Sequence, residues 1–95
     1  MITSKQRAKL RSMANTLDPI FQIGKGGLNE NMIESVDGAL ENRELVKITI
    51  LETADVDVRE ACNYISEKTG AEQVQCIGRR FVLYRESKDH KRIEL

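Results

Sequence analysis

The sequence predicts a small α/β domain of the two-layer α+β type, with a mixed four-stranded sheet and three helices in the order αβαβαββ. Two kinds of apolar pattern support this prediction. Three segments repeat apolar residues at the spacing of amphipathic helices, and four shorter segments read as extended strands. Helices and strands alternate along most of the chain, which is typical of a sheet with crossover connections and helices packed against it.

The size and composition favour one globular domain. The chain has 95 residues, of which 40% are apolar and 32% are charged, and this balance argues against disorder. We expect residues 1–95 to form a single domain that ends in a polar basic tail, 86–95. No apolar run approaches the roughly 20 residues that span a bilayer, and the N-terminus lacks the apolar stretch of a secretory signal. A cytoplasmic protein without a membrane partner is therefore expected.

The first predicted helix runs from Thr3 to about Thr16. Thr3 and Gln6 have the spacing of a capping box, and apolar residues follow at the i, i+3, i+4 and i+7 positions. An extended segment, 19–23, begins at the only proline of the chain and ends at Gly24. The apolar stripe of the helix is flanked by basic residues on both sides, so we expect it to pack on the core rather than on a membrane.

The middle of the chain predicts a second helix, a strand and a third helix. Asn29 is a favourable N-cap, and apolar residues recur every four positions after it. Residues 44–51 form a β-branched run that is typical of a strand. The third helix is expected to begin at Asp55 or Asp57, either of which can cap it, and to stop at Gly70.

Two short strands complete the predicted fold. They cover residues 74–77 and 81–84 and are rich in β-branched and aromatic residues. Only Gly78-Arg79-Arg80 lies between them, which leaves room for one tight turn and so predicts a hairpin. A hairpin that follows helix-linked strands implies a sheet with both parallel and antiparallel pairs.

The net charge is zero, but the two signs are segregated along the chain. Residues 1–27 carry five basic residues against one acid, residues 28–72 carry eleven acids against four basic residues, and residues 73–95 carry six basic residues against three acids. If the fold brings the two basic ends together, it creates a face that attracts polyanions, because salt screens charges beyond about 8–10 Å. Ordinary solvated helix faces would give the same pattern, so charge alone does not decide the function.

The segment GKGG, Gly24 to Gly27, is the sharpest local feature. Glycine permits positive φ angles and lets backbone N–H groups approach an anion closely. The loop leads into a helix N-terminus, which favours a nearby phosphate, and Lys25 adds a cation from the same turn. The spacing fits the GxxG loop with which KH domains clamp a nucleotide backbone. A plain strand-to-helix turn needs similar glycines, so the loop by itself is not specific.

Basic side chains elsewhere extend this candidate site. They are Lys5, Arg7, Lys9 and Arg11 of the first helix and Arg79 and Arg80 of the hairpin. If they converge on the loop and on Asn29, roughly four to six cations surround its backbone amides, which is enough for binding dominated by phosphate contacts. The aromatic residues are Phe21, Tyr64, Phe81 and Tyr84, all candidates for the core. We therefore expect recognition of RNA shape and backbone rather than of stacked bases.

The sequence predicts neither catalysis nor a cofactor. It has no Ser/His/Asp or Cys/His arrangement, and its only histidine, His90, lies in the polar tail. The Walker and GxGxxG patterns are missing, which argues against a small-molecule nucleotide substrate. Cys62 and Cys76 form no CxxC pair, so we expect no structural zinc. Reduced core cysteines are the favoured interpretation, and a disulfide stays open.

Six segments together resemble the CRM family, named for chloroplast RNA splicing and ribosome maturation, and in particular its single-domain bacterial YhbY-like members. The segments are TSKQRAKLRSMAN, PIFQIGKGGLNENMI, ELVKITI, the TG that ends the third helix, VQCIGRRFVLYRESK and KRIEL. The resemblance implies an RNA-binding domain whose four-stranded sheet and three helices resemble the C-terminal domain of bacterial initiation factor three. It also implies binding to ribosomal RNA in precursors of the large (50S) ribosomal subunit during assembly.

Carried over by position, the family's GxxG loop matches Gly24, Lys25, Gly26 and Gly27. Its basic surface matches the cations of the first helix together with Arg79 and Arg80, and Asn29 stands where a threonine cap is frequent in the family. Two other functions stay open. One is a KH-like binder of single-stranded RNA, and the other is an interaction module whose acidic segment, 28–72, docks a basic ribosomal protein or an assembly GTPase.

Overall fold

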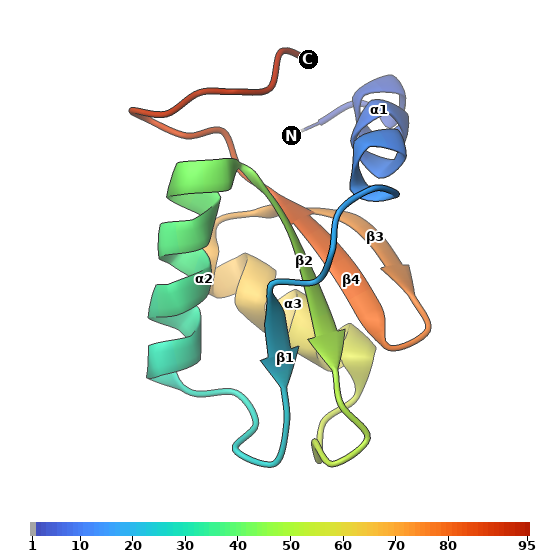
Figure 1. Cartoon of the computed structure of the whole chain (residues 1–95), viewed down its shortest axis with the longest axis vertical. Coiled ribbons are helices and arrows are strands. Elements are labelled where there is room, and N and C mark those ends of the chain that lie inside the picture. The colour runs from blue at the N-terminus through green and yellow to red at the C-terminus, as the bar shows by residue number, and fades with distance from the viewer. Residues whose placement is uncertain (1) are drawn as a thin grey trace.

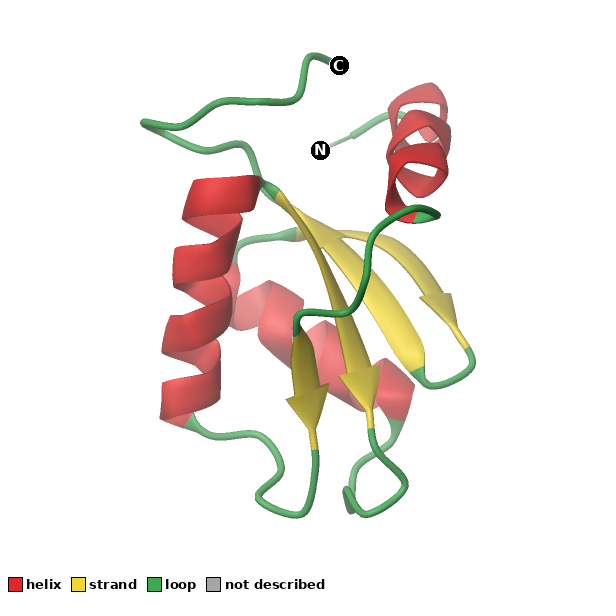
Figure 2. Ribbon diagram, viewed as in Figure 1, coloured by secondary structure: helices red, strands yellow, loops and turns green. Residues whose placement is uncertain are grey.

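The computed structural model describes residues 2–95, which form three helices and one mixed four-stranded sheet in the predicted order αβαβαββ. The elements are α1 (Ser4–Ala14), β1 (Phe21–Ile23), α2 (Glu30–Arg43), β2 (Leu45–Ile50), α3 (Val58–Thr69), β3 (Glu72–Ile77) and β4 (Arg80–Tyr84). Figures 1 and 2 show the sheet between the helices, with the glycine turn and α1 at opposite ends of the molecule. The fold class predicted from the sequence is confirmed. None of the helices within residues 2–95 is long and apolar enough to cross a membrane.

Local signals in the sequence set the helix ends. Thr3 and Gln6 form the expected capping box, in which each side chain accepts a hydrogen bond from the other residue's backbone N–H. Asn29 caps α2, as expected. Of the two aspartates considered for α3, Asp57 is the N-cap. Helix α3 stops at Gly70, whose φ of 73° is in the left-handed region that favours glycine.

The strand order is β1-β2-β4-β3, with β1 parallel to β2 and the other pairs antiparallel. Three connections therefore lie at one end of the sheet, called the loop end here: the glycine turn 24–27, the β2–α3 connection 51–57 and the hairpin turn 78–79. The other end, called the terminal end, holds the start of α1 and the tail 86–95, and Ile2 N donates to Glu72 there. This division decides which predicted site residues can meet.

The sheet buries its two faces unequally. Helices α2 and α3 cover one face over a core that includes Ile23, Leu40 and Ile48. Helix α1 covers only the terminal end of the other face, where Leu10, Ala14, Leu45, Val74, Val82, Tyr84 and Ile93 form a second core. The rest of this second face stays uncovered and is called the open face below. Because strand side chains alternate, Lys47 of β2 and Arg80 of β4 project from the open face.

Three expectations about single residues need correction. Glu44 does not begin a strand but ends α2, with a φ of 67°, and its side chain is completely buried. Arg80 belongs to β4, so the hairpin turn consists of residues 78–79 alone. Tyr64 is not in the core. It is 39% exposed on α3, where Lys68 Nζ lies 5.7 Å from its ring centroid.

Both cysteines are free thiols that pack with the larger core. Cys62 is completely buried, and burial raises the pKa of its thiol to about 11. Cys76 is partly buried beside it. A thiol with a raised pKa, such as that of Cys62, is a poor nucleophile and metal ligand. The expected core position is confirmed for Cys62, and Cys76 packs against the same core.

Candidate nucleic-acid interface

The glycine segment makes the turn from β1 into α2. Gly27 N donates to Gly24 O at 2.9 Å, and Gly27 adopts a φ of 64°. Within residues 2–95 the N–H groups of Lys25 and Gly26 have no hydrogen-bond partner. A Cβ added at Gly26 would meet no atom within 4 Å, and its φ lies outside the left-handed region. Neither packing nor backbone strain within the described chain therefore requires a glycine at this position, and the bare backbone is open to an approaching ligand.

The turn rests on the neighbouring β2–α3 connection. Leu51 N donates to Ile23 O at 2.8 Å, and a Cβ added at Gly24 would lie 3.4 Å from Leu51 Cδ1 and 3.5 Å from Thr53 Oγ1. Arg79 of the hairpin reaches the same point, because its Nε donates to Ile50 O at 2.9 Å and its Nη2 to Leu51 O at 2.6 Å. The structure thus brings Arg79 to the loop end beside the glycine turn.

The loop end carries charges of both signs. Four exposed acids accompany Lys25 and Arg79 there: Glu30 in the first turn of α2, and Glu52, Asp55 and Asp57 in the 51–57 connection. An anion held at the glycine turn would therefore depend on the unpaired backbone N–H groups and on Lys25 more than on a general excess of positive charge.

The first-helix cations do not reach the glycine turn. Helix α1 presses its apolar stripe onto the terminal end, and Arg7 Nε donates to Gln73 O at 3.1 Å. Lys9 Nζ donates to Glu94 O of the tail, and Ile93 joins the core that α1 completes. The two ends of the chain do meet, as expected, but the expectation that they meet beside the glycines is wrong (Figure 1). The reason is that burial of the apolar stripe fixes the position of α1 and with it the cations Lys5, Arg7, Lys9 and Arg11.

The open face carries cations between the two ends of the sheet. A hollow of about 180 Å³, called the sheet hollow below, is lined by Asn15, Lys47, Gln75, Ile77, Arg80, Phe81 and Val82. No acidic residue of the described chain, 2–95, lines it. Lys47 Nζ donates to Leu17 O at 2.9 Å, which places the ammonium group on the side toward α1. Ile77 is 65% exposed at the hollow and offers an apolar contact beside the two cations.

Sequence reasoning missed Lys47 as a site residue, although a signal was present. Lys47 interrupts the apolar run of β2, and strand alternation places it on the face opposite Val46 and Ile48. A cation that alternates with buried residues in a central strand must face either solvent or a partner. The sequence of β2 alone does not show whether that face is covered or exposed, because this depends on how far α1 extends across the sheet.

The acidic segment is partly used inside the molecule, at the tail. Glu44 accepts hydrogen bonds from Ser87 N, Arg92 N and Ile93 N at 2.7, 2.6 and 2.8 Å. Although burial opposes its charge, these hydrogen bonds lower the pKa of Glu44 below its ordinary value. Sequence reasoning gave no hint of this contact.

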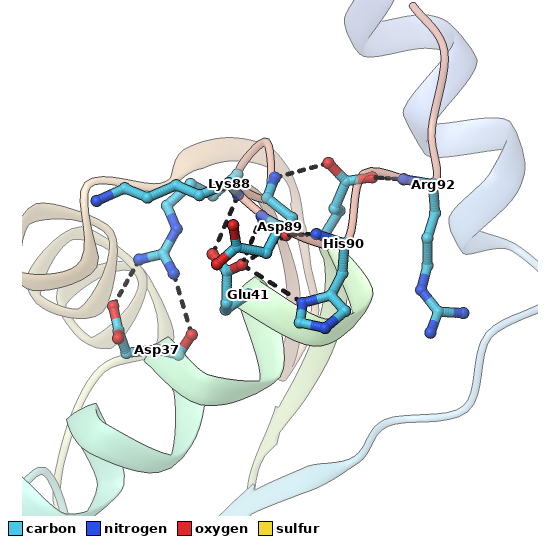
Figure 3. Close-up of polar contacts among 9 residues, drawn as sticks. Asp37, Glu41, Lys88, Asp89, His90 and Arg92 are labelled. Atoms are coloured by element: carbon cyan, nitrogen blue, oxygen red, sulfur yellow. Dashed lines mark hydrogen bonds and ion pairs between the residues drawn. The ribbon is translucent and has the colours of Figure 1, made fainter.

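Glu41, one helical turn earlier, holds the same tail (Figure 3). It accepts hydrogen bonds from Ser87 Oγ at 2.7 Å and from Lys88 N and Asp89 N at 3.2 and 3.1 Å. These bonds, led by the one from Ser87, lower the pKa of Glu41 to about 2. Asp37 is paired with Arg85 in the same region. Asp37, Glu41 and Glu44 of the segment 28–72 therefore have internal partners in or beside the tail.

No group of three or more His, Cys, Asp or Glu side chains within residues 2–95 is placed to hold a metal ion. Two features of this small α+β fold are available to a ligand. They are the unpaired backbone N–H groups at the glycine turn and the cationic sheet hollow, whose lining contains no acid among residues 2–95. Such features are typical of modules that contact the phosphate backbone of nucleic acids.

The chain belongs to the CRS1 / YhbY (CRM) domain family, whose pattern matches residues 2–85. It is 46% identical over 95 residues to the "Probable RNA-binding protein YqeI" of Bacillus subtilis, covering 100% of this chain and 99% of that protein. It is 35% identical over 91 residues to an "RNA-binding protein" of Haemophilus influenzae, covering 95% of this chain and 91% of that protein.

A solution structure of a protein from Staphylococcus aureus has a similar fold. It aligns with a TM-score of 0.82 at 55% sequence identity and covers 100% of this chain and 99% of that one. The family resemblance predicted from the sequence is thus confirmed, and the relatives bear the names of RNA-binding proteins.

Proposed function

We propose that this protein is a non-enzymatic RNA-binding protein that holds the RNA backbone across the open face of its sheet, from the glycine turn toward α1. The observation that carries the proposal is the sheet hollow, where Lys47 and Arg80 lie together without an acidic neighbour in the lining. The unpaired N–H groups of Lys25 and Gly26 mark one end of this surface. The names of the relatives, which describe RNA-binding proteins, support the same choice of ligand.

A neutral total charge does not oppose this function. Helices α2 and α3, which carry much of the acidic segment, cover the face of the sheet opposite the open face. The molecule extends 36 × 26 × 22 Å, which exceeds the Debye length of about 8 Å at physiological salt. Phosphates on the open face are therefore attracted by the near cations while the far acids are screened.

The open face favours contacts with backbone and shape. Phe81 and Tyr84 are buried, and Tyr64 lies on α3 on the other side of the sheet. Without an exposed aromatic platform, binding rests on phosphate and sugar contacts, which carry little sequence information. The resemblance to bacterial YhbY-like proteins makes ribosomal RNA in precursors of the large (50S) subunit the target that we propose, with a role in cytoplasmic ribosome assembly.

Charge-removing variants test the proposed surface. Lys47→Gln and Arg80→Gln should each weaken binding to an RNA hairpin and lower the slope of log affinity against log salt by about 1, because each removes one phosphate contact. Lys68→Gln is the matched control, since Lys68 is an exposed cation on α3. Binding is measured by fluorescence anisotropy over a salt series. Equal losses for the control and the open-face variants would contradict the proposal.

The proposed target is tested in cells. A tagged copy of the protein should sediment with incomplete large subunits in a sucrose gradient and move to the top after ribonuclease treatment. Co-sedimentation that survives ribonuclease would favour a protein partner instead. Preference for unpaired RNA over the hairpin in the anisotropy assay would favour the KH-like alternative.

A further inference from the structure

A groove at the terminal end lies outside the surface described above. It has a volume of about 430 Å³ and lies where the end of α1, the end of α2 and the tail come together. Met13 and Leu17 line it from the α1 side, each with 37% of its surface exposed, and Ile93 lines it from the tail. These side chains leave an apolar wall open to solvent.

Two arginines line the same groove. Arg43 is the last residue of α2 and Arg92 belongs to the tail, and neither side chain has an ion pair or hydrogen bond within residues 2–95. Among the residues that the structure describes, no acid lines the groove. Figure 3 shows the side chain of Arg92 pointing away from Asp37 and Glu41. Two unneutralised guanidinium groups beside an apolar wall fit an occupant that has both an anionic group and an apolar face.

The buried carboxylate of Glu44 accounts for the meeting of the two arginines. Glu44 follows Arg43 directly at the end of α2, and its side chain accepts from the backbone N–H groups of Arg92 and Ile93. Glu44 thus ends the helix that carries Arg43 and fixes the tail segment that carries Arg92. The groove depends on the tail, which lies beyond the residues 2–85 matched by the family.

We propose that this groove binds one unpaired nucleotide of the RNA, with its phosphate between Arg43 and Arg92 and its base against Met13 and Leu17. The proposal rests on the RNA-binding function proposed above. Guanidinium groups bind phosphate through paired hydrogen bonds and also stack on bases, so the groove needs no aromatic residue. Thr16 also lines the groove, and its hydroxyl donates to Met13 O, which leaves the hydroxyl oxygen free to accept from a base.

Continuity with the open face favours RNA as the occupant. Lys47 lines the sheet hollow, and its Nζ donates to the backbone oxygen of Leu17, which lines the groove. An RNA strand that lies on the open face can therefore continue into the groove past this shared contact. An amphipathic acidic peptide has the same two kinds of group, and its binding is one outcome of the test.

The test compares two RNAs: a fully paired hairpin, and the same hairpin with a single-stranded extension. The double variant Arg43→Gln/Arg92→Gln should weaken binding of the extended hairpin by about tenfold and that of the paired hairpin by about twofold or less. Leu17→Asn changes no charge and should weaken only the extended hairpin. Thermal unfolding by circular dichroism checks that each variant folds. A 4-thiouridine in the extension should crosslink to residues 13–17 or 92–93, located by mass spectrometry.

Each other outcome has a distinct meaning. Equal weakening of both RNAs by the arginine variant, with no effect of Leu17→Asn, would overturn the nucleotide groove in favour of plain phosphate attraction. Arginine-dependent binding of a glutamate- and leucine-rich peptide, with RNA binding unchanged, would overturn it in favour of a protein partner. If Lys47→Gln weakens binding of both RNAs while the groove variants change nothing, the groove proposal is overturned and the proposed RNA-binding function stands. If the wild-type protein binds neither RNA, the proposed function itself has failed.

Discussion

Substitution at Gly26 separates a role in folding from a role in binding. A Cβ at this position would meet no atom within 4 Å, and its φ is not in the left-handed region. Gly26→Ala should therefore leave the free energy of unfolding unchanged or raise it by about 0.4–1 kcal/mol, because alanine reduces the entropy of the unfolded chain. Gly27 has a φ of 64°, so Gly27→Ala should instead cost about 1–2 kcal/mol.

Gly26→Asp tests the role of this position in RNA binding. The new carboxylate has open space, so the fold should survive, but it stands beside the unpaired N–H groups of Lys25 and Gly26 where we propose that a phosphate binds. Two like charges about 4 Å apart repel by about 1 kcal/mol in water and about 4 kcal/mol at an effective dielectric constant of 20. RNA affinity should fall by at least about fivefold, the equivalent of about 1 kcal/mol.

The assay combines urea unfolding followed by circular dichroism with fluorescence anisotropy on one RNA hairpin. Gly26→Ala is the matched control, because it adds a Cβ without charge. Wild-type RNA affinity in the aspartate variant would refute the proposed role of the turn in phosphate binding. A loss of stability in both Gly26 variants would refute the inference that the fold does not require a glycine at this position.

Two further predictions concern the tail and the hairpin. Because hydrogen bonds lower the pKa of Glu41 from 4.5 to about 2 in the folded protein, its contribution to stability is present above pH 4.5 and is lost as the pH falls toward 2. Wild type should then lose more stability than Glu41→Gln between pH 5 and pH 3 in urea unfolding, and equal losses would count against this contact. Arg79→Gln removes two hydrogen bonds to β2 and its connection and should lower the free energy of unfolding by about 1–2 kcal/mol. Arg80→Gln, whose side chain has no such bond within residues 2–95, should leave thermal unfolding unchanged, and similar melting temperatures for the two variants would contradict the difference.

Local chemistry made part of the structure predictable. The capping box at Thr3, the cap at Asn29 and the stop at Gly70 each depend on neighbours within a few residues, so the sequence carries them directly. Strand alternation in β2 likewise separates buried from partly exposed side chains from Val46 onward. The glycine turn was identifiable for the same reason, since its residues are contiguous.

Contacts between distant residues were not predictable in this way. Glu44 bonds to backbone groups more than 40 positions away, and nothing near it in the sequence marks it as buried. The position of α1 depends on the shape of the sheet end formed by Leu45, Val74 and Val82, which come from three strands. The distribution of cations over the surface follows from that packing. For this reason the cations of α1 and of the tail lie together at the terminal end, and of the predicted cations outside the glycine turn it is Arg79 that reaches the loop end.

The most direct test is a titration of the isotope-labelled protein with an RNA hairpin, followed by NMR of backbone amides. If RNA lies across the open face, the resonances of Gly26, Lys47 and Gln75 should shift or broaden together, while those of Tyr64 and Lys68 on α3 stay in place. Shifts concentrated on α2 and α3, with an unchanged open face, would contradict this placement of the RNA.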